Sequence, residues 1–183
     1  MDHKLAQGIG RRRWVLSGIL VIVALLCLIP LLPGAAVQTT TVYVVRHAEK
    51  ADNTANPPLS AAGQARAQEL ARVLGDDEID AIFVTSFIRT QQTGAPVAAA
   101  NGIQVEQYPA GNAQSVVDTI LADHVGDRVL VVGHSNTVDD IAAGLGAGGL
   151  SDLGEDQFDR LFVIHRLGNV THLDRLRFGA EAP

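Results

Sequence analysis

From residue 41 onward, short runs of β-branched and other apolar residues alternate with longer segments whose apolar residues recur at helical spacing. The short runs predict strands and the longer segments predict helices. Strands are expected at 41–45, 80–85, 103–108, 128–132, 161–166 and 170–177. Helices are expected at 60–74, at 89–100, after residue 112 and at 136–145. This alternation predicts an α/β fold, a three-layer sandwich around a mixed, mostly parallel sheet.

Four local patterns refine this expectation. Ser60 is a helix N-cap, and Gly75 follows the end of that helix. Its inward face is expected to hold Leu59, Gly63, Ala67, Leu70 and Leu74. The run at 128–132 is almost wholly apolar, which is typical of a strand covered on both faces. The last two strands flank Gly168-Asn169 and predict a hairpin at a sheet edge, whereas the Asn- and Pro-rich stretch 51–58 predicts a loop.

The amino-terminal 36 residues have a different pattern. Arg11, Arg12 and Arg13 precede an apolar run at 15–32, which is just long enough to cross a membrane. Gly34 and Ala36 stand at −3 and −1 of a signal-peptide cleavage after residue 36. The sequence thus predicts a signal peptide or membrane anchor at 1–36, with the membrane contacted through residues 14–32 if they are retained. Because the arginines favour the cytoplasmic side, the domain at 37–183 is expected to be extracytoplasmic.

Charge and cysteine content narrow the function classes. The chain carries 14 Lys and Arg against 20 Asp and Glu, a net charge of −6. The predicted domain at 37–183 holds ten basic and nineteen acidic residues, which argues against a nucleic-acid partner. Cys27 is the one cysteine, so an internal disulfide and a zinc site with several thiolates are excluded.

Polar residues with catalytic chemistry follow three of the predicted strands. Arg46 and His47 end the first, Arg89 follows the second, and His134 follows the strand at 128–132. In open α/β sheets, ligands bind at the carboxyl ends of strands. Arginine forks match phosphate oxygens, and a neutral imidazole can attack phosphorus. Together these residues predict a phosphoryl-transfer site.

Three segments carry a family resemblance: 46–50 (Arg-His-Ala-Glu-Lys), 86–93 with Ser86, Arg89, Thr90 and Thr93, and 133–135 (Gly-His-Ser). With the helix segment 59–67, they resemble the signatures of the histidine phosphatase (phosphoglycerate-mutase-like) superfamily. The resemblance spans residues 41–140. It implies a phosphoglycerate-mutase-like fold and hydrolysis of a small phosphorylated substrate through a phosphohistidine, with no metal or other cofactor.

The resemblance also assigns roles to individual residues. His47 is the implied nucleophile, and Arg46, Arg89 and His134 bind the phosphoryl oxygens, with Asn53 assisting. These motifs do not separate mutase from phosphatase chemistry.

Two positions depart from the family pattern. Ala48 stands where many members have glycine, and residues 106–112 lack the usual acidic motif after the third strand, so Glu106 is the remaining candidate for a general acid. A general acid typically contributes 10²–10⁴-fold to rate. A site without one would favour substrates with labile phosphoryl bonds.

Two alternatives stay open at this stage. Residues 133–137 imitate a nucleophile elbow, which would make Ser135 the nucleophile of a serine hydrolase with Asp152 or Asp156 and His165 or His172, although Thr137 replaces the second glycine. The other alternative is a module that binds a phosphoryl ligand without turnover.

Overall fold

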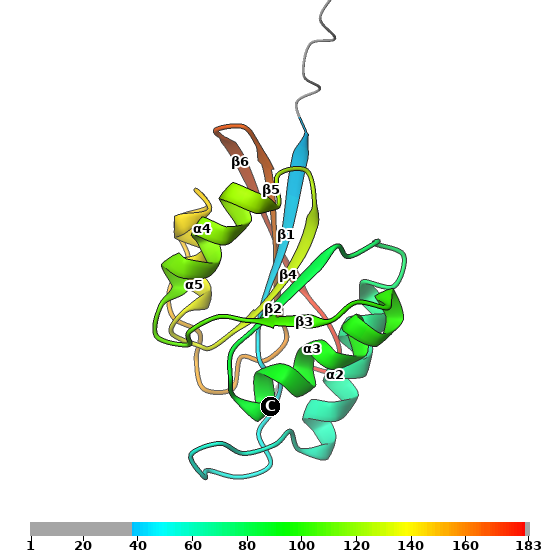
Figure 1. Ribbon diagram of the computed structural model, residues 1–183. Helices are drawn as coiled ribbons and strands as arrows, with labels where there is room; N and C mark the ends of the chain where they lie inside the picture. The colour runs from blue at the N-terminus through cyan, green and yellow to red at the C-terminus, as the bar shows by residue number, and fades with distance from the viewer. Residues whose placement is uncertain (1–37, 182–183) are drawn as a thin grey trace, which may run out of the picture. The chain divides into compact units, whose positions relative to one another are not determined.

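The computed structural model describes residues 38–181, which form a six-stranded sheet with two helices on each face (Figure 1). The strands are β1 (Thr39–Arg46), β2 (Ala81–Val84), β3 (Val105–Gln107), β4 (Arg128–Gly133), β5 (Arg160–Leu167) and β6 (Val170–Arg177). The helices are α2 (Ala61–Val73), α3 (Ile88–Asn101), α4 (Ala113–Asp123) and α5 (Val138–Gly144). The predicted alternation of strands and helices is therefore confirmed.

The strand order is β3-β2-β4-β1-β5-β6. The first four strands in this order are parallel, β5 runs antiparallel to β1, and β6 pairs with β5 as the predicted edge hairpin. The predicted mixed, mostly parallel sheet is confirmed.

Alternate side chains of the central strands enter two separate cores. Val42, Val44 and Val131 pack toward α4 and α5. Val45 and Val132 pack toward α2 and α3, which lie across the sheet in Figure 1. Because successive strand residues point to opposite faces, an uninterrupted apolar run is what a sheet covered on both sides requires.

The register of β1 and β4 aligns the ends that carry the candidate chemistry. Arg46, the last residue of β1, is paired with Gly133, the last residue of β4. The backbone N–H of His47 donates to the Gly133 carbonyl at 3.0 Å and extends this pairing past the end of β1. His47 and His134 therefore leave the sheet side by side.

Helix α2 is fixed against the segment that follows His47. The Ser60 side chain accepts a hydrogen bond from the Gly63 N–H, as the predicted N-cap requires. A side chain at Gly63 would collide with the backbone carbonyl of Glu49, so glycine allows this close approach. All five residues predicted to face inward are buried. This packing holds residues 47–49 between the sheet and α2.

The predicted boundaries need small corrections. α3 begins at Ile88 and continues through Pro96 to Asn101, so the bend considered at Pro96 does not end the helix. β3 is only three residues long, and α5 starts two residues later than predicted. The predicted signal or anchor at 1–36 lies outside the described residues, and the division at residue 37 stays a prediction. Within residues 38–181, no helix is both long and apolar enough to span a membrane.

Candidate active site

Arg46, His47, Arg89 and His134 line one cavity of about 360 Å³ at the carboxyl ends of the parallel strands. Arg46 and His47 come from the end of β1, Arg89 from the first turn of α3, and His134 from the residue after β4. The structure therefore brings together the four residues that the sequence placed at three strand ends. A larger cavity, of about 460 Å³, lies beside α2, but its three glutamates and one arginine make it unsuited to an anion.

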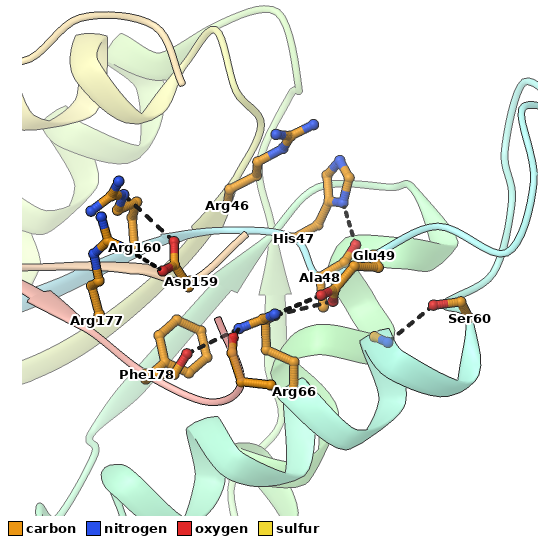
Figure 2. Close-up of polar contacts among 12 residues, drawn as sticks. Arg46, His47, Ala48, Glu49, Ser60, Arg66, Asp159, Arg160, Arg177 and Phe178 are labelled. Carbon is orange, nitrogen blue, oxygen red and sulfur yellow. Dashed lines mark hydrogen bonds and ion pairs between the residues drawn. The ribbon is translucent and has the colours of Figure 1, made fainter. Parts of the chain in front are cut away.

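His47 is 4% exposed, and its ring is fixed by a backbone contact. Its Nδ1 lies 2.8 Å from the carbonyl oxygen of Ala48 (Figure 2). Because a carbonyl only accepts hydrogen bonds, Nδ1 carries the proton and Nε2 keeps its lone pair. His47 is thus held in the tautomer that a nucleophile needs.

His134 is oriented by two buried threonines. Its Nε2 lies 3.1 Å from Oγ1 of Thr85, the residue after β2. Thr85 Oγ1 in turn lies 2.9 Å from Thr90 Oγ1, and the Thr90 hydroxyl donates to the Phe87 carbonyl at 2.8 Å. Since Thr85 and Thr90 are fully buried, this chain of hydrogen bonds fixes the His134 ring against β2 and α3.

The Arg46 guanidinium is held by an aromatic ring and by two backbone carbonyls. Its Cζ lies 4.1 Å from the centre of the Phe158 ring. Its Nη1 donates to the carbonyls of Gly154 at 2.6 Å and Glu155 at 3.1 Å. Its Nε is buried and has no partner among the described residues. The Nε–Nη2 edge is thus the fork that remains for a phosphate.

The Arg89 guanidinium also packs on an aromatic ring and keeps a donor that can bind an anion. Its Cζ lies 4.1 Å from the centre of the Phe87 ring, and its buried Nε has no partner within residues 38–181. Thr93 ties this turn of α3 to the nucleophile, because its Oγ1 donates to the Arg89 carbonyl at 2.7 Å and accepts from the Ala48 N–H at 3.0 Å. Buried arginine donors without a protein acceptor suit a ligand that supplies the oxygens.

Burial and positive charge keep both histidines neutral. Burial, together with the nearby Arg89, His134 and Arg46, lowers the pKa of His47 to about 3, against the opposing hydrogen bond to Ala48. Burial also lowers the pKa of His134 to about 4, helped by Arg89 and Arg46. The His47 and His134 rings meet edge to face, with centroids 5.4 Å apart. At neutral pH the cavity combines two neutral imidazoles with two guanidinium cations.

The rim of the cavity is formed by more exposed residues: Lys50, Phe87, Ala110, Gly111, Ser135, Asn136 and Glu155. Glu49 and Lys50, neighbours in the sequence, point to different sites. Lys50 lines this cavity, whereas the Glu49 carboxylate pairs with buried Arg66 (Figure 2). The rim therefore has both a basic and an acidic side chain.

Two residues considered from the sequence lie elsewhere. Asn53 is exposed in the loop at 51–56 and does not line the cavity. Glu106 is exposed on edge strand β3 and does not line it either. The composition of residues 51–58 predicted a loop but not the direction in which the Asn53 side chain points. The Glu106 side chain on β3 points to solvent.

The serine-hydrolase alternative does not assemble its predicted partners. His165 Nδ1 lies 3.2 Å from Oγ1 of Thr41, near the start of β1, and His172 is paired with His165 across the hairpin. Ser135 follows the opposite, carboxyl end of β4. About five strand residues separate Thr41 from the site, roughly 16 Å at 3.3 Å per residue. Neither histidine reaches Ser135.

Several residues that shape the site were not predicted from the sequence. Thr85 orients His134, Phe87 and Phe158 support the two arginines, and Glu155 lies on the rim. Thr85 directly follows a predicted strand and could have been found by its position. Phe158 and Glu155 lie in the irregular segment between α5 and β5, where no periodic pattern indicates direction.

A family comparison agrees with this geometry. The model of the histidine phosphatase superfamily (branch 1) matches residues 42–110, which include Arg46, His47 and Arg89. Over these residues the chain is similar to the histidine phosphatase superfamily. His134 lies beyond the matched region, and it is the fold that brings it beside His47.

Relatives with similar sequences extend the comparison only in part. An uncharacterized protein of Mycobacterium tuberculosis (strain ATCC 25618 / H37Rv), Rv0525, is 37% identical over 79 residues. This match covers 39% of the present chain and 39% of that relative's length.

Solved structures of superfamily members share the fold. Bacillus stearothermophilus YhfR has a TM-score of 0.61 at 18% identity, covering 73% of this chain and 95% of its own. The protein histidine phosphatase SixA, solved with tungstate, has a TM-score of 0.58 at 18% identity over 75% and 96%. A putative α-ribazole-5′-P phosphatase of Escherichia coli has a TM-score of 0.62 at 16% identity over 78% and 97%. The predicted phosphoglycerate-mutase-like fold is confirmed.

Proposed function

We propose that this protein is a metal-independent phosphatase that hydrolyses a small phosphomonoester or phosphoramidate through a phosphohistidine at His47. The observation that carries the proposal is the fixed tautomer of His47, whose Nδ1 lies 2.8 Å from the Ala48 carbonyl in a cavity shared with Arg46, Arg89 and His134. A buried neutral imidazole beside two guanidinium groups suits nucleophilic attack on a phosphate anion.

The first step forms a bond from His47 Nε2 to phosphorus and breaks the bond to the leaving group, which takes the electron pair. Arg46 and Arg89 hold the phosphoryl oxygens through their free N–H groups, and His134 lines the same pocket. A water molecule then attacks phosphorus, breaks the P–N bond and releases inorganic phosphate. Because the donors are fixed by packing before substrate arrives, they stabilise the transition state with little reorganisation.

Trapping the intermediate tests this proposal. The purified full-length chain is incubated with an aryl phosphate, quenched in alkali and digested. We expect acid-labile, alkali-stable phosphate on the peptide that contains His47, and none in a His47→Gln variant. Binding of phosphate without phosphohistidine or turnover would instead identify a binding module, and labelling of Ser135 by a fluorophosphonate would identify a serine hydrolase.

We also propose that the catalytic domain lies outside the cytoplasm, with residues 14–32 targeting or anchoring it. Three arginines directly before the apolar run support this orientation. Fusing a reporter that is active on only one side of the membrane to the carboxyl terminus tests it. Activity of a cytoplasmic reporter, with none from an extracytoplasmic one, would contradict the proposal.

A further inference from the structure

The floor and the rim of the active site differ sharply in burial. Arg46, His47 and His134 on the floor are 3%, 4% and 8% exposed, whereas the Glu155 side chain on the rim is 92% exposed. In-line attack by His47 expels the leaving group on the side of phosphorus away from His47. On the proposed mechanism, the leaving group therefore departs toward the rim, which is where a proton donor is needed.

Glu155 has a fixed backbone and an exposed side chain. Its carbonyl, like that of Gly154, accepts a hydrogen bond from Arg46 Nη1. The preceding Leu153 donates its N–H to the Ser135 carbonyl at 2.9 Å, and the Gly154 N–H donates to Gln157 Oε1 at 2.9 Å. These contacts attach the segment to both sides of the cavity, so the position of Glu155 on the rim is not arbitrary.

The carboxylate of Glu155 faces the phosphate-binding fork. Its Oε2 lies 3.8 Å from Arg46 Nη2, next to the Nε that has no partner in the described chain. Of the described residues that line the cavity, Glu155 alone carries a carboxyl group. A phosphoryl group held by the Nε–Nη2 edge of Arg46 would thus have Glu155 at its outer side.

We propose that Glu155 is the general acid of the reaction, a role that rests on the proposed phosphatase function. As His47 Nε2 bonds to phosphorus, the P–O bond breaks and the leaving oxygen takes both electrons and the proton of the Glu155 carboxyl group. The resulting carboxylate then accepts a proton from the attacking water, whose oxygen displaces His47 from phosphorus. Glu155 ends protonated, and the products are an alcohol and inorganic phosphate.

Arg46 faces Glu155 at 3.8 Å, and Asp156 is its neighbour in the chain. The other titratable groups that line the cavity are Lys50, His47, Arg89 and His134.

The dependence of rate on the leaving group tests this role. The full-length chain and its Glu155→Gln variant are compared on p-nitrophenyl phosphate, phenyl phosphate and a simple alkyl phosphate. We expect E155Q to lower kcat/KM on the alkyl ester by about 10²- to 10⁴-fold, and to change it only a few-fold on p-nitrophenyl phosphate, whose leaving group needs no proton.

Asp156→Asn is the matched control, because it removes the adjacent charge from a residue that does not line the cavity. It should keep the leaving-group dependence of the unmodified chain. An equal change on all three esters would make Glu155 an electrostatic screen and overturn the proposal, as would failure of the unmodified chain to hydrolyse the alkyl ester. Absence of phosphohistidine in the unmodified chain would overturn the proposed function as well, whereas its presence with a uniform E155Q effect would overturn only the role of Glu155.

Discussion

His47 and His134 stand edge to face in a buried pocket, with their ring centroids 5.4 Å apart. Each ring has a separate partner on its far side, the Ala48 carbonyl for His47 and the Thr85 hydroxyl for His134. Two imidazoles this close, flanked by Arg46 and Arg89, favour the uncharged state. We therefore expect the pKa values of these two catalytic residues to make the stability of the fold depend on pH.

We predict that the free energy of unfolding falls as pH drops below 6.5. In the unfolded chain each histidine has a pKa near 6.5, whereas in the folded protein burial and Arg89 lower these pKa values to about 3 for His47 and about 4 for His134. Above pH 6.5 both states are neutral and no proton is linked to folding. Between pH 6.5 and 4 only the unfolded chain binds the protons, so stability declines by up to about 1.4 kcal/mol per pH unit for each histidine.

Urea unfolding at pH 7.5, 6 and 5 measures this slope. His47→Gln should reduce it, since the variant has lost one of the two linked groups. His172→Gln removes an exposed histidine and should leave it unchanged. Equal slopes in the unmodified chain and the His47 variant would contradict the prediction.

Arg89→Met should separate activity from stability. The Arg89 guanidinium has a buried Nε without a partner in the described part of the chain, which is costly unless a ligand supplies an oxygen. Replacement by an apolar side chain of similar length should therefore leave the melting temperature unchanged or raise it. The kcat/KM for an aryl phosphate should fall by about 10²- to 10³-fold, as expected for a lost preorganised donor. A parallel loss of melting temperature and activity would show that Arg89 acts mainly in folding.

The placement of the four central residues could be predicted because each ends, or closely follows, a clear strand pattern. Arg46 and His134 follow runs of apolar residues that become β1 and β4, and parallel strands share their carboxyl edge. The order of the strands could not be predicted in the same way. That β4 lies between β1 and β2 depends on long-range pairing, which local periodicity does not encode.

Three of the differences between the sequence predictions and the structure have a common cause. Asn53, Glu155 and Phe158 all lie in irregular segments, where side-chain direction depends on tertiary contacts. Phe158 is positioned by stacking under Arg46, and Glu155 by hydrogen bonds from Arg46 to the adjacent backbone. A charged residue from one end of the domain thus organises a loop about a hundred residues later, and no pattern within that loop could reveal it.

Thr85→Val should impair catalysis through His134. Valine preserves the shape of threonine but removes the hydroxyl 3.1 Å from His134 Nε2, leaving a buried ring nitrogen without its partner. A loss of about 1–3 kcal/mol corresponds to a fall in kcat/KM of roughly 5- to 150-fold. Thr85→Ser keeps the hydroxyl and should recover most of the activity. Thr119→Val, which removes a hydroxyl bonded within α4, is the control and should have no such effect on rate.

Arg66→Met should destabilise the fold far more than a comparable change on the surface of the same helix. Arg66 is buried and donates from Nε and Nη2 to Glu49 and from Nη1 to the Phe178 carbonyl (Figure 2). Its Nη1 also donates to the carbonyl of Ala180. The substitution leaves the Glu49 carboxylate without its counter-charge and removes the side-chain hydrogen bonds to the carboxyl-terminal segment. We expect the free energy of unfolding to fall by about 3–5 kcal/mol. Arg72→Met breaks the exposed pair with Glu69 and should cost at most about 1 kcal/mol.

A double-mutant cycle measured by urea unfolding tests whether the loss of stability comes from the ion pair between Arg66 and Glu49. Glu49→Gln and Arg66→Met should each destabilise the protein, and the double variant should be more stable than the sum of the two losses predicts, because neither charge is then left unpaired. Strict additivity would show that Arg66 acts through the carbonyls of Phe178 and Ala180 alone. Since Glu49 lies two residues after His47, we expect the same variants to lower kcat in proportion as the segment between β1 and α2 loosens.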